Sequence, residues 1–229
     1  MNDYIYNKGI KGLIFDYGGT LDTGGRHWGK VLWSVWQEIG VPVDETCFCE
    51  AYVHGERMLG RHPIIKPHFT FRQTLEEKLR LELEFVGQAS FLTQVLDHVY
   101  EATVRHTAHS REVLQQIYGQ LPMVLVSNFY GNMPVVLREF GLDGLFQQVI
   151  ESAVVGFRKP DPRIFQMGVE ALSLAPSEVA VVGDSIEKDI IPARQIGCKS
   201  IWIKGEQWTD DAVDEHLADS VITDVCELL

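Results

Sequence analysis

The sequence predicts an α/β protein with a doubly wound parallel sheet, interrupted after its first strand by an all-helical segment. Three observations support this fold class. Residues 12–16 form a short, mainly apolar run that is typical of a buried strand. From residue 121 onward, short apolar runs alternate with helical patterns, as is typical of a parallel sheet covered by helices on both faces. Between these parts, residues 24–108 show helical spacing of apolar residues and no strand pattern.

The helical segment begins with a regular apolar stripe. Its apolar residues at positions 28, 31, 32, 35, 36 and 39 have the spacing that places side chains on one face of a helix. Similar patterns cover residues 75–86 and 91–102, and an irregular stretch with two prolines lies at residues 60–68. We therefore expect an inserted all-helical domain over residues 24–108 and an α/β core domain made of residues 1–23 and 109–229.

The second part of the core is expected to alternate strands with helices. The expected strands cover residues 123–126, 148–151, 179–182, 200–203 and 221–223. The expected helices cover residues 135–140, 164–172 and 190–196.

Composition excludes two classes of partner. The formal net charge is −12 and the chain has no basic run, so we expect no binding to nucleic acid. No apolar run approaches the roughly 20 residues that cross a bilayer, and the N-terminus lacks the basic and apolar parts of a signal peptide. We therefore expect a cytoplasmic protein without a membrane partner. We also expect it to be a monomer or a homodimer.

Polar side chains follow the predicted strands at the points where those strands end. Open parallel sheets bind ligands at this edge, so we expect these residues to converge. A carboxylate, a hydroxyl, an ammonium and a pair of acids suit phosphoryl-type chemistry, because they supply a nucleophile, a donor, a fixed cation and a metal anchor. The residues in question are Asp16, Ser127, Asn128, Lys159, Asp184 and Asp189.

Four segments resemble the sequence motifs of the haloacid dehalogenase-like (HAD) hydrolase superfamily. These are FDYGGTLD, VLVSN, GFRKPDP and VVGDSIEKD, which occur in the order of that family and span about residues 12–203. The resemblance implies a Rossmann-like core with a helical cap. It also implies a Mg²⁺-dependent enzyme, such as a phosphatase of a small phosphorylated metabolite, that forms a covalent intermediate on an aspartate.

The resemblance assigns a role to each matching residue. Asp16 matches the nucleophile, Ser127 the residue that hydrogen-bonds the transferring group, and Lys159 the lysine that steadies the charge of nucleophile and substrate. Thr20 matches the threonine that helps to fix the first loop beside the substrate. Asn128 is either a substrate-binding residue or a turn former.

The resemblance also implies a set of magnesium ligands. Asp16, the backbone carbonyl of Gly18 and Asp184 match the ligands, and Asp189 matches the acid that supports the waters of the metal. Oxygen ligands of this kind suit Mg²⁺.

The sequence departs from the family pattern at Gly18. Phosphatases of the family usually place a second aspartate there, which protonates the leaving oxygen and then activates water. General acid–base catalysis is worth roughly 10²–10⁴-fold in rate, so its loss favours substrates whose leaving group needs little protonation. Alternatively, the acid comes from Asp22, from His27 or from the cap.

Three other functions remain open. A phosphonatase also lacks the second aspartate and needs a cap lysine, for which Lys66 is the candidate. A 2-haloacid dehalogenase lacks it too, but needs no metal, whereas this chain keeps Asp184 and Asp189. A HAD-like scaffold would bind a phosphorylated ligand without turnover.

One irregular cap segment, residues 55–68, is rich in cations for an acidic chain. It is either a loop that selects an anionic substrate or an ordinary solvated loop. In the first case we expect Arg61 and Lys66 to bind the substrate.

Overall fold

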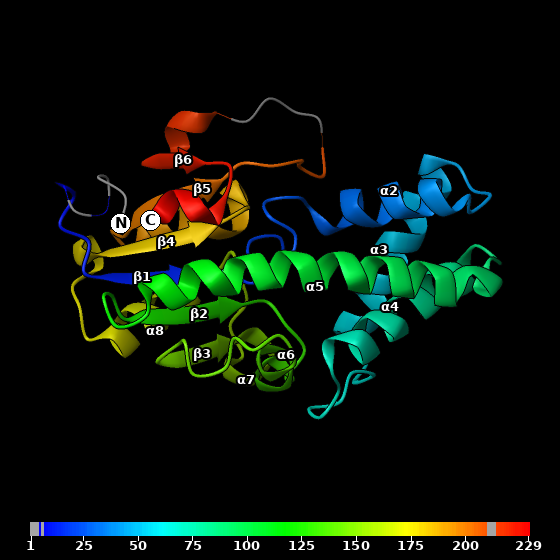
Figure 1. Cartoon of the computed structure of the whole chain (residues 1–229), viewed down its shortest axis with the longest axis horizontal. Coiled ribbons are helices and arrows are strands. Elements are labelled where there is room, and N and C mark those ends of the chain that lie inside the picture. The colour runs from blue at the N-terminus through cyan, green and yellow to red at the C-terminus, as the bar shows by residue number, and fades with distance from the viewer. Residues whose placement is uncertain (1–4, 6, 210–213) are drawn as a thin grey trace.

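The computed structural model describes residue 5, residues 7–209 and residues 214–229. Its core is a parallel sheet of six strands in the order β3-β2-β1-β4-β5-β6. Figure 1 shows the sheet on one side of the molecule and the helical cap on the other. The predicted α/β fold with a parallel sheet is therefore confirmed. The strands are β1 (Gly12–Phe15), β2 (Met123–Ser127), β3 (Gln148–Glu151), β4 (Val179–Gly183), β5 (Lys199–Ile203) and β6 (Ser220–Ile222).

The sheet is buried on both faces because alternate residues of its strands join different apolar clusters. In β1, Leu13 and Phe15 pack in the larger cluster, which also contains residues of the long helix α5 (Leu92–Ile117). Ile14 points the other way and packs against α8 (Arg163–Leu172). This alternation explains why the central strands are almost wholly apolar.

Of the other core helices, two lie near their predicted positions, and the short helix at residues 152–155 was not predicted. These core helices are α6 (Met133–Glu139), α7 (Ser152–Val155) and α9 (Ile191–Gln195), with short turns η2 (Pro176–Glu178), η4 (Glu215–Leu217) and η5 (Val225–Leu228). The helix expected at residues 190–196 is preceded by a π-helical turn, η3 (Ile186–Ile190). This turn carries the last acid of the fourth motif.

The cap consists of three helices and the first part of α5. The helices are α2 (Trp28–Ile39), α3 (Glu45–Arg61) and α4 (Phe71–Phe85), and the turn η1 (Ala89–Phe91) precedes α5. Side chains fix the starts of these helices: Asp44 accepts from the N–H of Cys47, and Thr70 forms a capping box with Gln73. The starts of these cap helices are therefore set by local sequence.

Helix α5 runs without a break from cap to core (Figure 1). Its 26 residues span about 39 Å. The domain boundary predicted at residue 108 falls inside this helix, where Ser110 Oγ donates to the carbonyl of Leu21 at 2.8 Å. The chain thus returns to the core through a rigid element instead of a loop.

Candidate active site

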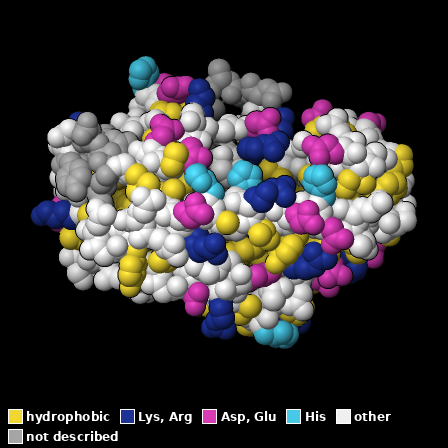
Figure 2. Space-filling model, viewed as in Figure 1, with side chains coloured by type: hydrophobic (Ala, Val, Ile, Leu, Met, Phe, Trp, Pro, Cys, Tyr) yellow, Lys and Arg dark blue, Asp and Glu magenta, His cyan; other side chains and the backbone are white. Residues whose placement is uncertain are grey.

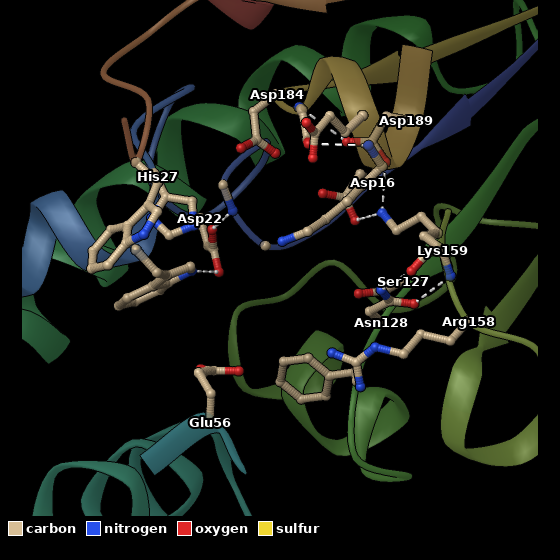
Figure 3. Close-up of a pocket in the computed structure, with 18 of the residues that line it drawn as sticks. Asp16, Asp22, His27, Glu56, Ser127, Asn128, Arg158, Lys159, Asp184 and Asp189 are labelled. Carbon is tan, nitrogen blue, oxygen red and sulfur yellow. Dashed lines mark hydrogen bonds and ion pairs between the residues drawn. The ribbon is translucent and has the colours of Figure 1, made fainter. Parts of the chain in front are cut away.

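A cavity of about 430 Å³ lies at the carboxyl ends of the strands, where the core meets the cap (Figure 3). The loops after β1, β2 and β4 and the segment before α8 line it from the core, and α3 and α4 line it from the cap. The predicted site residues that line it are Asp16, Gly18, Ser127, Asn128, Lys159, Asp184 and Asp189.

The centre of the site is a buried ion-paired group on the core side. Lys159 Nζ donates to Asp16 Oδ1 at 2.5 Å and to Asp189 Oδ1 at 2.7 Å. The three side chains are at most 6% exposed. Burial by itself lowers the pKa of Lys159, but the two carboxylates outweigh it and raise the pKa above its usual range. Lys159 is therefore a permanent cation beside the Asp16 carboxylate.

Three carboxylates form a cluster that a divalent cation would suit. Asp16, Asp184 and Asp189 are all buried, and each offers an oxygen within 4.8 Å of the others. Burial, with the charges of Asp16 and Asp189, raises the pKa of Asp184 well above its usual range, as expected for acids crowded around one ammonium group. Three carboxylates supply hard oxygen donors of the kind that Mg²⁺ prefers, and the ion would relieve the repulsion between their negative charges.

The close approach of the acids depends on a glycine. Gly19 has φ +96°, and a Cβ there would overlap the Asp184 carboxyl group. Thr20 Oγ1 lies 3.1 Å from Asp184 Oδ1 and 3.4 Å from Asp16 Oδ2. Thr20 is fully buried and outside the cavity lining, so it positions the carboxylates and does not itself reach into the cavity.

The second motif supplies one cavity hydroxyl and one positioning amide. Ser127 ends β2 and lines the cavity. The Asn128 amide exchanges two hydrogen bonds with the backbone of Lys159, donating to its carbonyl at 3.0 Å and accepting from its N–H at 2.9 Å. Asn128 therefore holds the lysine segment in place, and both polar ends of its side chain are engaged.

These motifs belong to a known family. A family model described as haloacid dehalogenase-like hydrolase matches residues 10–197. The chain belongs to the haloacid dehalogenase-like hydrolase family. A putative HAD-hydrolase of Bacillus subtilis, solved with bound magnesium, shares this fold, with a TM-score of 0.59, 16% identity and 96% of each chain covered.

Curated relatives of this HAD hydrolase include two phosphatases. A glyceraldehyde 3-phosphate phosphatase of Pyrococcus furiosus is 36% identical over 38% of this chain and 37% of its own. A phosphoserine phosphatase of Thermus thermophilus is 44% identical over 36% of this chain and 34% of its own. The matched segments thus span little more than one third of these relatives.

Asp22, one of the alternative acids expected from the sequence, lies in the same loop after β1 as Asp16. It is 1% exposed and lines the cavity. Its Oδ1 accepts from the N–H of Gly19 at 2.7 Å, and its Oδ2 accepts from Trp28 Nε1 at 3.1 Å. Burial raises the pKa of Asp22 to about 8, the charge of Asp16 acts in the same direction, and the two N–H donors oppose the shift.

His27 is unsuited to act as an acid. Burial lowers its pKa to about 4, and the charge of Lys188 acts in the same direction. Its Nδ1 accepts from the N–H of Gly29 at 3.0 Å, as the N-cap of α2. The imidazole is thus neutral at pH 7 and belongs to the start of the helix.

The structure does not bring Arg61 and Lys66 to the cavity. Both are exposed, and Lys66 Nζ donates to the carbonyl of Pro63 at 2.7 Å. The cap lysine that reaches the cavity is Lys78 of α4, which pairs with Glu56 of α3 and lies 3.0 Å from Glu82. Arg61 is the last residue of α3 and Lys66 lies in the loop that follows, and neither of these expected substrate-binding residues lines the cavity.

Aromatic side chains close the cap side of the cavity. Trp208 follows β5 and stacks on Tyr52 of α3, with ring centroids 4.9 Å apart, and its ring centroid lies 5.1 Å from that of His27. A Cβ at Gly29 would overlap the Trp208 ring. No sequence pattern indicated this contact, because it joins segments about 150 residues apart.

The face of the molecule in Figure 2 shows acidic and basic side chains interspersed, without a large basic area. Within the described part of the chain, no helix is long and apolar enough to cross a membrane.

Proposed function

We propose that this HAD hydrolase is a Mg²⁺-dependent phosphatase of a small phosphorylated metabolite that forms an aspartyl-phosphate on Asp16. The observation that carries the proposal is the Asp16 carboxylate, held 2.5 Å from Lys159 Nζ at the floor of the cavity. The two phosphatases among its relatives support a phosphate ester as substrate. A cytoplasmic location and a monomeric or homodimeric state are part of the same proposal.

The residues divide the chemistry between them. Lys159 holds Asp16 Oδ1 and directs the carboxylate as the nucleophile toward phosphorus. The Ser127 hydroxyl and the Lys159 ammonium offset charge on the phosphoryl oxygens in the transition state. Bound between Asp16, the Gly18 carbonyl and Asp184, Mg²⁺ would supply further charge neutralisation. Water then attacks the phosphorus of the aspartyl-phosphate and releases phosphate.

The alternative functions are less well supported. Lys66, the lysine expected for a phosphonatase, lies outside the cavity. Burial would lower the pKa of Lys78, but Glu82 and Glu56 raise it well above its usual value. An ammonium so paired is a poor Schiff-base nucleophile. A dehalogenase would not need the buried cluster of three carboxylates.

A substrate panel with and without chelator tests the proposal. The panel contains 4-nitrophenyl phosphate, glyceraldehyde 3-phosphate, phosphoserine and 2-chloropropionate. We expect phosphate release that requires Mg²⁺ and is lost in Asp16→Asn, because an amide is a poor nucleophile. The matched control is Asp143→Asn, at an exposed position, which should keep wild-type activity.

Two results would contradict the proposal. Chloride release that needs no metal would show that the protein is a dehalogenase. Release of neither phosphate nor chloride from any of the compounds would indicate a binding scaffold.

A further inference from the structure

We propose that Asp22 is the general acid and base of this enzyme, and that it replaces the side chain missing at Gly18. This role rests on the phosphatase function proposed above. It identifies which cavity acid gives a proton to the leaving oxygen and takes one from the attacking water.

Few acids are available for this task. Apart from the carboxylate cluster, the acids that line the described part of the cavity are Asp22, Glu56 and Glu187. Glu56 lies on the cap and is paired with Lys78, which favours its ionised form. Glu187 is exposed on the η3 turn. Asp22 alone of the three is buried on the loop that carries the nucleophile.

The position of Asp22 matches the gap left by Gly18. A Cβ built at Gly18 would have Trp28 Nε1 as its nearest neighbour, at 3.8 Å. The same indole nitrogen donates to Asp22 Oδ2 at 3.1 Å (Figure 3). The carboxyl group of Asp22 and a Cβ at position 18 therefore have the same neighbour, the indole nitrogen of Trp28.

The loop holds Asp22 in a fixed orientation. The N–H of Gly19 bonds to Oδ1 at 2.7 Å while Trp28 bonds to Oδ2. Two hydrogen bonds to one buried carboxyl group reduce the rotamer freedom of Asp22, as general acid–base catalysis requires. Burial, with a further contribution from Asp16, raises the pKa to about 8, so a proton is present on Asp22 near neutral pH.

The proton transfers balance in both steps. An oxygen of Asp16 bonds to phosphorus, the bond from phosphorus to the ester oxygen breaks, and the leaving oxygen receives its proton from Asp22. The products are an alcohol, an aspartyl-phosphate and the Asp22 carboxylate. In the second step water attacks phosphorus, Asp22 takes a proton from that water, and the bond from phosphorus to Asp16 breaks. Phosphate leaves, and both aspartates return to their starting states.

Rapid-mixing kinetics of Asp22→Asn with 4-nitrophenyl phosphate test the proposal. Nitrophenolate leaves without a proton, so we expect one equivalent to be released in a burst at close to the wild-type rate. The following turnover should be slower by roughly 10²–10⁴-fold, because no base activates water. Asp143→Asn is the matched control and should show wild-type kinetics.

Leaving-group dependence in the wild-type enzyme is a second test that needs no variant. With Asp22 as acid, kcat/KM for alkyl phosphates should lie within about tenfold of that for aryl phosphates, against roughly 10²–10⁴-fold without an acid. A steep dependence of the wild-type kcat/KM on the leaving group would overturn the proposal. So would an Asp22→Asn variant whose burst and turnover rates are both unchanged, or both reduced by the same factor. Failure of the phosphatase function itself would differ, since the wild type would then release no phosphate.

Discussion

Gly18 departs from the motif of the phosphatases that this chain resembles, and its surroundings allow the departure to be reversed. Its φ lies outside the left-handed region, and the atom nearest to an added Cβ would be 3.8 Å away, an ordinary contact. An aspartate should therefore fit at this position without backbone strain.

We predict that Gly18→Asp gives the wild type little gain on alkyl phosphates, less than about threefold, because Asp22 already supplies the proton. In the Asp22→Asn background the same change should restore turnover by about two to three powers of ten, within the range of roughly 10²–10⁴ for acid–base catalysis. Steady-state kinetics of the two single variants and the double variant measure this. A large gain in the wild type would show that the enzyme lacks an acid.

At the residue scale, the strand-end residues were predictable and the cap residues were not. Parallel strands end at one edge of the sheet, so Asp16 and Lys159 meet although 143 residues separate them. The position of a cap segment follows no such rule, and neither Arg61, at the end of α3, nor Lys66 lines the cavity. A better signal was available in α4, where Lys78 shares a helical face with the buried Leu75. Lys78 on this face is buried and pairs with Glu56 and Glu82.

At the scale of elements, the contact between α3 and α4 contains an acid that is buried against Lys78. Burial raises the pKa of Glu82 from 4.5 to about 7, although Lys78 acts in the opposite direction. The folded state thus binds this proton more tightly than the unfolded state. The stability that the proton provides is complete below pH 4.5 and is lost as the pH rises to about 7.

We predict that the Glu82→Gln variant does not lose this stability as the pH rises, because glutamine cannot ionise. Between pH 4.5 and 7, the wild type should lose up to about 3 kcal/mol of unfolding free energy relative to Glu82→Gln. Urea unfolding at several pH values measures the difference. The exposed Glu112→Gln is the control and should follow the wild type. Parallel profiles for Glu82→Gln and wild type would contradict the assignment.

Helix α5 shows what periodicity alone does not reveal about domains. The apolar pattern of the cap continues into the core without a turn signal, because α5 is one helix from Leu92 to Ile117. Its first part packs on α2 and α4, and its last part packs on the sheet and on η5. The pattern predicts the helix but cannot show which partner each turn contacts.

At the scale of the whole molecule, different parts of the chain line the cavity. The strand ends of the core supply Asp16, Lys159 and the acidic cluster, and α3 and α4 supply the opposite wall. Besides α5, further segments join the parts. The loop before α2 meets the segment after β5 where the N–H of His27 donates to the carbonyl of Glu206 at 2.8 Å, and Asn132, before α6, donates to the carbonyl of Phe69 at 2.9 Å. The cavity therefore exists only in the assembled chain.

The covalent intermediate at Asp16 is the step on which the proposed chemistry depends most, and mass spectrometry can detect it directly. The wild-type enzyme is mixed with Mg²⁺ and 4-nitrophenyl phosphate, quenched in acid during turnover and digested, with Asp16→Asn treated in parallel. We expect the mass of one phosphoryl group on the peptide that contains Asp16, and no such group in the variant. Phosphate release without this adduct, or an adduct on a different residue, would contradict Asp16 as the nucleophile.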